Sequence, residues 1–347
     1  MKTYQVGVVS GKFRLLHKAH KEVLIRATLE NIKSLVVIIH DNETIHRYST
    51  LEELRVSIGT ILKDTHMPYK IIVCQEIFPD IITWENFVIE QIGHQDILMF
   101  NSKEDYENIT LDNKFIHCKN LKTISVTEIE KNPYDIEFYE KVAKEFMPYI
   151  NKKIVISGVE SSGKTQLAIK LSKILNTIYS PECGRGYARE FLGADDEAFT
   201  PKDFVFIAQN QLAQDRKLNK AAHRTLIVDT DPFVTLRFLY AYHAEYIKRG
   251  IITQDFEKEF TDAISMLETI CKTYKSHLIF LLQPNNEFTS DGIRWDNQTQ
   301  AYRKAQFNDL KKIYDKFGHK YIIVKGDTYS EKFEFMEKEI EKIMNIY

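Results

Sequence analysis

The sequence has few cysteines and no long apolar run. Its four cysteines among 347 residues stand far apart and form no C-x-x-C pair, which argues against a disulfide framework and favours reduced thiols. The longest apolar runs, LVVII at 35–39 and LIFLL at 278–282, are only strand-length, whereas a membrane-spanning helix needs about 20 apolar residues. The N-terminus carries no signal-peptide cleavage site. We therefore expect a cytoplasmic protein that does not associate with membranes.

An excess of charge of one sign is also missing. The chain has 47 basic and 49 acidic residues and a formal net charge of −2, which gives no support to nucleic acid as a partner. Nothing before the first apolar run at residue 4 has the pattern of a helix-turn-helix, so we expect no DNA-binding domain. The length predicts two domains of roughly 100–200 residues each.

Short β-branched runs alternate with longer amphipathic segments along the whole chain. This alternation is typical of parallel sheets with crossover helices. The polar step EFMPYINKK at 145–153 separates two such series. The sequence therefore predicts an α/β protein of two doubly wound parallel-sheet domains, residues 1–150 and 151–347. The expected strands are 4–9, 34–40, 70–74, 96–100 and 114–118 in the first domain, and 153–157, 225–229, 277–282 and 320–324 in the second.

The strongest motif is the G-x-x-x-x-G-K-T pattern in KIVISGVESSGKT, residues 153–165. A buried strand leads into this loop and a helical pattern follows it, the context that a phosphate-binding loop requires. Backbone N–H groups and the positive helix end would face the phosphates of ATP, Lys164 would neutralise them, and the Thr165 hydroxyl would bind Mg²⁺. A chance match in a Gly/Ser-rich loop is the alternative. The expected ATP-binding residues are Gly158, Glu160, Ser161, Ser162, Gly163, Lys164 and Thr165.

Two aspartates close the predicted strand 225–229. In TLIVDTD, Asp229 ends a buried run and Asp231 follows two residues later. The carboxyl ends of strands in such sheets form the edge where ligands bind. A carboxylate there can hold Mg²⁺ or deprotonate an acceptor hydroxyl, and the sequence leaves open which aspartate has which role. A solvated Asp-Thr-Asp turn is the alternative.

Two further segments carry charges suited to a phosphoryl acceptor. PECGRGYARE at 181–190 follows a short run that could form a strand, and we expect its Glu182 and Arg185 to bind substrate. SDGIRWDNQTQAYR at 290–303 starts with an Asp-Gly turn, and its Arg294 fits a lid that neutralises the transferred phosphoryl group. Ordinary surface charges and a polar loop are the respective alternatives.

The second half resembles ribosylnicotinamide kinase. GVESSGKT, the E-x-G-R of PECGR, LIVDTD and SDGIR occur in the order found in the bifunctional NMN adenylyltransferase/ribosylnicotinamide kinase family, the NadR-like proteins. The resemblance covers roughly residues 153–347. It implies that this half is a P-loop kinase that transfers the γ-phosphoryl group of ATP to the 5′-hydroxyl of nicotinamide riboside, which gives NMN.

The same resemblance implies that the first half is a Rossmann-like nucleotidyltransferase that joins NMN to the adenylyl group of ATP, giving NAD and pyrophosphate. GVVSGKFRLLHKAH at 7–20 is similar to the family signature G-x-F-x-P-x-H-x-G-H. Such a reaction needs positioning and charge neutralisation, with no covalent intermediate. A metal site at the histidine pair has less support, because no ligand cluster lies near it in sequence. The expected residues are Gly11, Lys12, Phe13, His17 and His20, with Lys12 and both histidines in catalysis.

A second family signature, I-S-x-[ST]-x-I-R, corresponds to ISVTEIE at 124–130. Ser125 and Thr127 stand where their donors would hold the triphosphate. The final arginine is Glu130 here, and a carboxylate would repel the phosphate oxygens that an arginine binds. Lys131 is adjacent, but neighbours on a helix point about 100° apart.

The first signature also departs from the family. Its proline is Leu15, which removes a rigid turn, and its second glycine is Ala19. Three hypotheses therefore stand: an enzyme with both activities, a kinase whose first domain binds nucleotide but is catalytically weakened, and a nucleotide-binding regulator without turnover. ATP, nicotinamide riboside and NMN or NAD are the expected ligands, and the sequence leaves the oligomeric state open.

Overall fold

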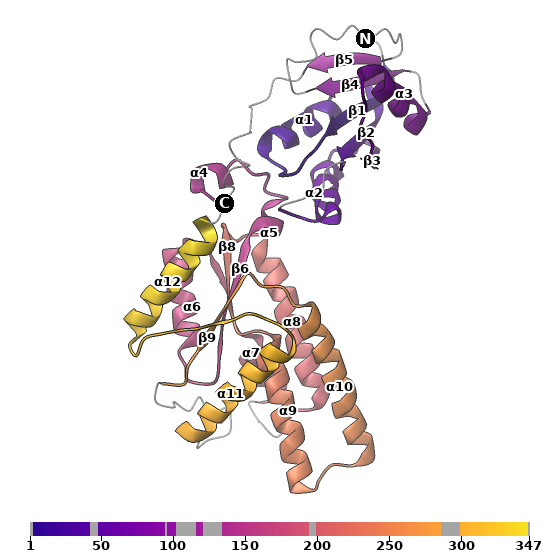
Figure 1. Cartoon of the computed structure of the whole chain (residues 1–347). Coiled ribbons are helices and arrows are strands. Elements are labelled where there is room, and N and C mark those ends of the chain that lie inside the picture. The colour runs from indigo at the N-terminus through magenta and orange to yellow at the C-terminus, as the bar shows by residue number, and fades with distance from the viewer. Residues whose placement is uncertain are drawn as a thin grey trace. The chain divides into compact units, whose positions relative to one another are not determined.

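The computed structural model describes residues 3–41, 48–93, 96–101, 116–120, 134–193, 199–285 and 299–345. The chain divides into two compact units, residues 1–150 and 151–346 (Figure 1). Each unit has its own five-stranded parallel sheet. No helix within the described ranges has both the length and the apolar character that crossing a bilayer would require.

The sheet of the first unit has the strand order β3-β2-β1-β4-β5, and every pair of neighbours is parallel. Its first strand therefore lies at the centre, and the chain extends the sheet in one direction before it returns to the other side. This order is typical of doubly wound nucleotide-binding folds. The strands are β1 (Tyr4–Gly11), β2 (Ile32–His40), β3 (Tyr69–Cys74), β4 (Ile97–Asn101) and β5 (Ile116–Asn120).

Alternation along β2 gives this sheet two apolar faces. Leu35 and Val37 pack into one hydrophobic cluster, which includes α1 (Lys18–Thr28) and α2 (Leu51–Lys63). Val36 and Ile38 pack into a second cluster, which includes α3 (Ile81–Ile92). Successive side chains of a strand point to opposite faces, so a strand buried on both sides reads as a continuous apolar run.

The chain segment at 134–150 completes the core of the first unit. It contains two short helices, α4 (Ile136–Tyr139) and α5 (Met147–Ile150). Tyr139, Val142 and Phe146 are fully buried and belong to the same cluster as α1 and α2. The boundary between the two units follows immediately, after Ile150.

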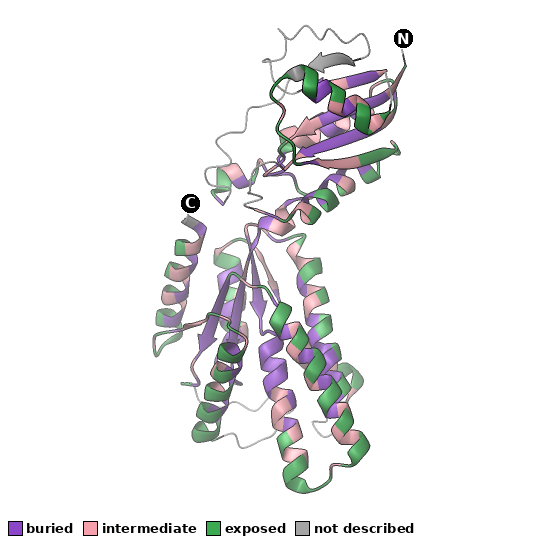
Figure 2. Ribbon diagram, turned by 45° about the vertical axis from the view of Figure 1, so that its right-hand side comes forward, coloured by how far each residue is buried: buried purple, intermediate pink, exposed green. Residues whose placement is uncertain are grey.

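The sheet of the second unit has the order β10-β9-β6-β8-β7, again all parallel. β6, the first strand of this unit, lies at the centre, so the order reverses beside it and opens a crevice at the carboxyl edge. Figure 2 shows these central strands as buried. The strands are β6 (Lys152–Gly158), β7 (Ile178–Ser180), β8 (Thr225–Asp229), β9 (Leu278–Leu282) and β10 (Ile322–Ile323).

Helices surround this second sheet. Apolar side chains of α8, α9, α10 and α11 pack with those of β6, β8 and β9 into one cluster. Proline at the first position of α8 and of α9 suits a helix start, where no intrahelical N–H bond is lost. The helices are α6 (Lys164–Ile174), α7 (Cys183–Phe191), α8 (Pro201–Asn219), α9 (Pro232–Arg249), α10 (Gln254–Thr273), α11 (Gln300–Lys316) and α12 (Tyr329–Asn345).

The predicted fold class is confirmed: both sheets are parallel and carry crossover helices. Each predicted strand overlaps an observed one, and the run at 178–180 is a further strand, β7. Most boundaries differ by one or two residues; β1 extends to Gly11, β2 begins at Ile32, and β10 comprises only Ile322–Ile323. Strand ends are the least reliable part of such predictions because apolar patterning continues into the flanking turns.

A capping box at the start of α2 provides a stability test for the first unit. The Thr50 hydroxyl accepts a hydrogen bond from the Glu53 N–H at 3.2 Å, and the Glu53 carboxylate accepts one from the Thr50 N–H at 2.7 Å. Thr50→Ala should lower the free energy of unfolding by about 1 kcal/mol, because the N–H groups at positions 50 and 53 lose the reciprocal hydrogen bonding of the capping box. Urea unfolding followed by tryptophan fluorescence measures this. A Trp295→Phe background leaves Trp84 of α3 as the single reporter.

Thr60→Ala is the matched control. Thr60 lies in the interior of the same helix, is exposed, and bonds only to the Val56 carbonyl oxygen among the hydrogen bonds of the described residues. Alanine has the higher helix propensity there, so this variant should be neutral or slightly more stable. Equal loss of stability in both variants would contradict the capping role.

Candidate active sites

The phosphate-binding loop connects β6 to α6 and has the backbone that the motif predicts. Gly158 has φ 148° and Gly163 has φ 94°, conformations that residues with a Cβ rarely adopt. A Cβ at Gly158 would lie 2.9 Å from the Leu282 carbonyl oxygen of β9. These two glycines therefore allow the chain to turn tightly beside the neighbouring strand and to start α6 with its N–H groups facing the loop.

Two polar side chains of this loop share one backbone acceptor. Lys164 Nζ donates to the Val159 carbonyl oxygen at 2.9 Å, and Ser162 Oγ donates to the same oxygen at 2.8 Å. Lys164 is only 6% exposed. Its ammonium group is thus held over the loop at the start of α6, where a phosphate would also meet the helix dipole.

Thr165 connects the phosphate-binding loop to the end of β8. Its Oγ1 donates a hydrogen bond of 2.6 Å to Asp229 Oδ2. The other carboxylate oxygen, Asp229 Oδ1, is buried and has no hydrogen-bond partner among the described residues. Parallel pairing of β6 with β8, in which Ile156 lies opposite Asp229, brings these segments to one sheet edge.

Three charged groups, Glu182, Lys164 and Arg185, act on Asp229. Burial, followed by the negative charge of Glu182, raises the pKa of the Asp229 carboxyl, which lies at about 6. Lys164, the Thr165 hydrogen bond and Arg185 act in the opposite direction. Because burial is the largest cause, this carboxyl is poised to change protonation state close to neutral pH.

The sequence left the roles of the two aspartates open, and the structure gives them different surroundings. Asp231 caps α9, where its Oδ1 accepts from the N–H groups of Phe233 and Val234 at 3.1 and 3.2 Å. Its Oδ2 accepts a hydrogen bond from the Tyr314 hydroxyl, whose oxygen in turn lies 2.7 Å from Ser157 Oγ and can accept the Ser157 proton. Both oxygens of Asp231 are thus occupied by protein groups.

Thr230 makes the turn between the two aspartates with an unusual backbone. Its φ of 76° lies in the left-handed region, which β-branched residues rarely enter. Its N–H donates to the Ile156 carbonyl oxygen at 3.0 Å. Backbone strain of this kind is characteristic of functional sites that the surrounding structure holds in place.

A cavity opens beside these residues, between α7, α8 and α9. It encloses roughly 650 Å³, its open mouth included. A concave site with an apolar wall and a few polar groups is typical of small-molecule sites. Aromatic side chains dominate its apolar wall: Phe199, Phe204, Phe238 and Tyr242. Its polar lining comes from Glu182, Arg185, Gln211, Thr230, Asp231 and Thr235.

Glu160 of the phosphate-binding loop is held by protein groups. Its Oε1 lies 3.2 Å from Arg237 Nη2 of α9, in an ion pair where both side chains are 4% exposed. With the Gln306 amide nitrogen turned toward Glu160, it lies 3.2 Å from Glu160 Oε2. Arg303 of α11 donates to the Glu160 carbonyl oxygen at 3.0 Å. Glu160 therefore anchors the loop to α9 and α11.

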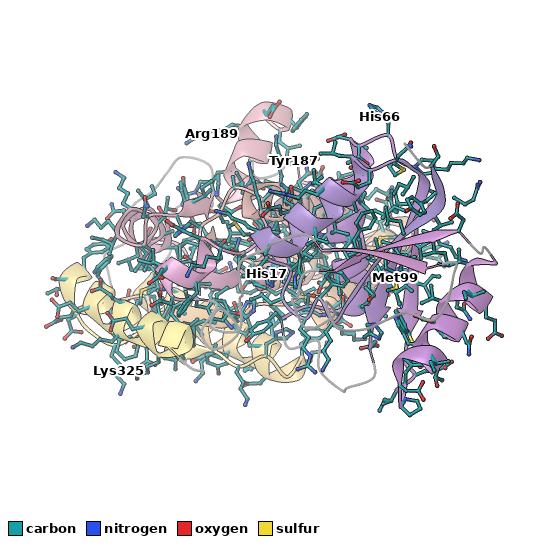
Figure 3. The ribbon with its side chains drawn as sticks, turned by 90° about the horizontal axis from the view of Figure 1, so that it is seen from above. His17, His66, Met99, Tyr187, Arg189 and Lys325 are labelled. Carbon is teal, nitrogen blue, oxygen red and sulfur yellow. The ribbon has the colours of Figure 1, made fainter. Side chains whose placement is uncertain are left out.

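The histidine pair of the first unit lies at the start of α1. His17, labelled in Figure 3, caps this helix, and its Nδ1 accepts from the His20 N–H at 3.2 Å. The two imidazole rings stack with centroids 3.6 Å apart, and Phe13 packs edge-on against His20 at 4.9 Å. The structure thus places three of the predicted residues together beyond β1, which ends at Gly11.

Both imidazoles are neutral at pH 7. Burial lowers the pKa of His17 to about 4. Burial, followed by the neighbouring His17, moves the pKa of His20 well below its ordinary value. A neutral ring has one N–H. That of His20 faces the Leu15 backbone, and His17, whose Nδ1 is an acceptor, keeps its Nε2–H as a donor for a phosphate without a fixed positive charge. Lys12 is exposed, and its positive charge contributes to lowering the pKa of His40 at the end of β2.

Leu15, which replaces the family proline, is fully buried in the core of the first unit. The loop around it pairs with the segment at 141–143. The Ala143 N–H donates to the Leu16 carbonyl oxygen at 2.9 Å, and the Lys18 N–H donates to the Lys141 carbonyl oxygen at 2.8 Å. Packing and backbone pairing therefore hold this turn without proline.

Several predicted residues lie outside the described part of the chain. They are Ser125, Thr127 and Glu130 of the second signature and Arg294 of the predicted lid. Conversely, sequence reasoning missed Arg237, Gln306 and Tyr314, which contact predicted site residues from distant helices. Each belongs to a helix whose own pattern is ordinary, so no local signal marked them.

The chain is similar to known proteins over both of its units. A family model described as an AAA domain matches residues 153–332. The Trifunctional NAD biosynthesis/regulator protein NadR of Escherichia coli is 25% identical over 352 residues, 94% of this chain and 80% of that protein. The protein of that name in Salmonella typhimurium is 28% identical over 215 residues, 62% of this chain and 48% of that protein.

Two solved NadR structures share the fold. One is a complex with NR, with a TM-score of 0.78 at 19% identity over 100% of this chain and 98% of that chain. The other is a complex with NAD and AMP-PNP, with a TM-score of 0.71 at 18% identity over 99% and 97%. Homology to a protein of NAD biosynthesis, joined to an ATP-type phosphate loop, supports an enzyme of kinase type. The chain belongs to the AAA domain family through residues 153–332 and is homologous to NadR over 94% of its length.

Proposed function

We propose that the second unit phosphorylates nicotinamide riboside to NMN with ATP, and that the first unit transfers the adenylyl group of ATP to NMN, giving NAD and pyrophosphate. The observation that carries the kinase proposal is the contact of Thr165, beside the phosphate-binding loop, with Asp229, next to an aromatic cavity that Glu182 also lines. A phosphate donor and a hydroxyl acceptor would meet there. The homologues' names and ligands agree with this assignment.

The proposed phosphoryl transfer is an in-line displacement. The 5′-hydroxyl oxygen attacks the γ-phosphorus, the bond to the bridging oxygen breaks, ADP leaves and the hydroxyl proton is released to a base. Lys164 would bind the phosphate oxygens, and the N–H groups at the start of α6 would face the same charge. Arg185, near Asp229, would neutralise the acceptor side.

Thr165 and Asp229 fit a magnesium site. The two side chains are already in contact, and Asp229 Oδ1 is a buried carboxylate oxygen with no hydrogen-bond partner in the described ranges. Oxygen ligands of this kind, shared with phosphates and water, suit Mg²⁺. The ion would neutralise charge that develops on the transferred phosphoryl group. Asp231 would hold the cavity wall through its helix cap.

The adenylyltransferase proposal rests on the histidine pair and on the family resemblance of its motif. Neutral His17 would donate a hydrogen bond to a phosphate oxygen, His20 would hold the His17 ring by stacking against it, and Lys12 would add a cation. The alternative is an active kinase with a catalytically weakened, nucleotide-binding first unit. Glu130 in place of the signature arginine is the observation that favours this alternative.

Lys164→Ala should lower the rate of NMN formation by on the order of 10²–10³-fold, because the transition state loses a buried cation. The measurement is NMN and ADP release from ATP and nicotinamide riboside. Lys173→Ala is the matched control, a lysine in the last turn of the same helix. A Lys164→Ala variant that forms NMN as fast as the wild-type protein would contradict the proposed role of the loop. A wild-type protein that forms no NMN would favour the regulator hypothesis.

Kinase activity should fall as the pH drops below about 6. Asp229 must be ionised to bind Mg²⁺ or to accept a proton, and its raised pKa means that it is protonated below this value. The rate constant kcat/KM should therefore lose about tenfold for each pH unit on the acid side. Asp229→Asn should leave a low rate without this acid limb. A wild-type profile that stays flat down to pH 5 would contradict the assignment.

ATP and NMN should give NAD and pyrophosphate if the first unit is catalytic. His17→Ala should reduce this rate by roughly 10²-fold, since a donor to the phosphates is removed. The kinase reaction of the same variant should be unchanged, which controls for the folding of the second unit and for the protein concentration. If the wild-type protein forms NAD no faster than His17→Ala does, the first unit is catalytically weakened. Recovery of NAD formation in Glu130→Arg would then identify Glu130 as the cause of the weakening.

A further inference from the structure

One side chain, Gln211, forms hydrogen bonds to both residues that flank Glu182 of the proposed acceptor site. Gln211 of α8 accepts a hydrogen bond at its Oε1 from the Cys183 N–H at 2.9 Å. Its Nε2 donates to the Pro181 carbonyl oxygen at 3.2 Å. We propose that Gln211 is a positioning residue that clamps the turn at 181–183 so that Glu182 faces the acceptor, and that the buried Asp215 sets the orientation in which Gln211 acts.

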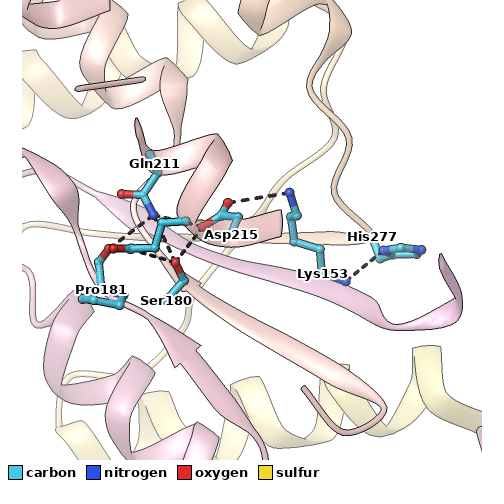
Figure 4. Close-up of polar contacts among 7 residues, drawn as sticks. Lys153, Ser180, Pro181, Gln211, Asp215 and His277 are labelled. Carbon is cyan, nitrogen blue, oxygen red and sulfur yellow. Dashed lines mark hydrogen bonds and ion pairs between the residues drawn. The ribbon is translucent and has the colours of Figure 1, made fainter. Parts of the chain in front are cut away.

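Asp215 lies at the centre of this network, and Figure 4 draws its contacts with Ser180, Gln211 and Lys153. Asp215 is 1% exposed, and its Oδ1 accepts from Ser180 Oγ at 2.7 Å and from Gln211 Nε2 at 3.0 Å. Because a carboxylate only accepts, the Gln211 amide must turn its nitrogen toward Asp215 and its oxygen toward Cys183. Lys153 Nζ, 3.6 Å from Asp215 Oδ2, keeps this carboxylate compensated.

The clamp matters because, among the described hydrogen bonds, Gln211 alone reaches both sides of Glu182; Gln214 shares its contact with Pro181 but not its contact with Cys183. Cys183 is the first residue of α7, so its N–H has no acceptor within the helix. Gln211 satisfies this donor from a site that is 5% exposed and lines the cavity. Glu182, 11% exposed, lines the same cavity and lies close enough to Asp229 to raise the pKa of that carboxyl.

Gln214, one turn further along α8, offers a matched control. Its Nε2 donates to the same two acceptors, Ser180 Oγ at 3.0 Å and the Pro181 carbonyl oxygen at 2.7 Å. Among the described hydrogen bonds it has none to Cys183 or Asp215, and it does not line the cavity. The two glutamines therefore share the contact with Pro181 and differ in the bonds to Cys183 and Asp215 and in burial, since Gln211 is buried and Gln214 only partly so.

The first test measures amide hydrogen exchange of the full chain and is independent of any substrate. Gln211→Met keeps the side-chain volume and removes the hydrogen bonds to Cys183, Pro181 and Asp215, so exchange at Cys183 should accelerate by at least about tenfold. Gln214→Met should leave Cys183 within about twofold of wild type. Unchanged protection of Cys183 in Gln211→Met would overturn the clamp, whatever the protein phosphorylates.

The second test is kinetic and rests on the proposed kinase function. Gln211→Met should raise KM for nicotinamide riboside by about tenfold while KM for ATP changes less than about twofold. The double variant Gln211→Met/Glu182→Gln should be no worse than Glu182→Gln alone, because one residue acts through the other. Additive losses, or equal effects of Gln211→Met and Gln214→Met, would overturn the proposal. Wild-type protein without NMN formation would instead refute the proposed function, and the exchange measurement would still decide the clamp.

Discussion

The parallel pairing of β6 with β8 determines where the charged groups of the second unit lie. It places Ile156 opposite Asp229, so the phosphate-binding loop and the aspartate turn leave the sheet at the same edge. Thr165 can then bond Asp229 across a separation of 64 residues in sequence. Lys164 over the loop, the loop glycines Gly158 and Gly163, and the Asp231 cap of α9 all lie at this shared edge. Doubly wound sheets bind their ligands at such an edge.

Burial has opposite chemical consequences in the two units. In the second unit it raises the pKa of Asp229, a carboxyl that lies near Glu182, Lys164 and Arg185. Carboxylates and cations in one site are what phosphoryl transfer to a hydroxyl would require. In the first unit it lowers the pKa values of His17 and His20, so the signature offers a neutral hydrogen-bond donor. Phosphates bound at the first site would therefore have to be neutralised by other cations. Glu130 matters for this reason, because it stands where the family signature has an arginine.

Support for the kinase site comes from residues without a motif of their own. Arg237 and Arg303 hold Glu160 of the phosphate-binding loop, and Gln211 holds both neighbours of Glu182. Such contacts keep reactive groups in place before a ligand arrives, which lowers the cost of positioning them in the transition state. They also join the loop, the acceptor cavity and three helices into one interlinked structure.

The sequence by itself determined the fold class, the strands and the residues of the phosphate-binding loop, because apolar periodicity and glycine spacing act locally along the chain. It also identified Asp229, Glu182 and the histidine pair as candidates. Only the tertiary structure separated Asp229 from Asp231, since the difference lies in Tyr314 and Thr165, which contact them from other elements. The roles of Gln211 and Asp215 likewise arise from packing of α8 against a distant turn, and buried hydrogen bonds between distant segments leave no periodic signal in sequence.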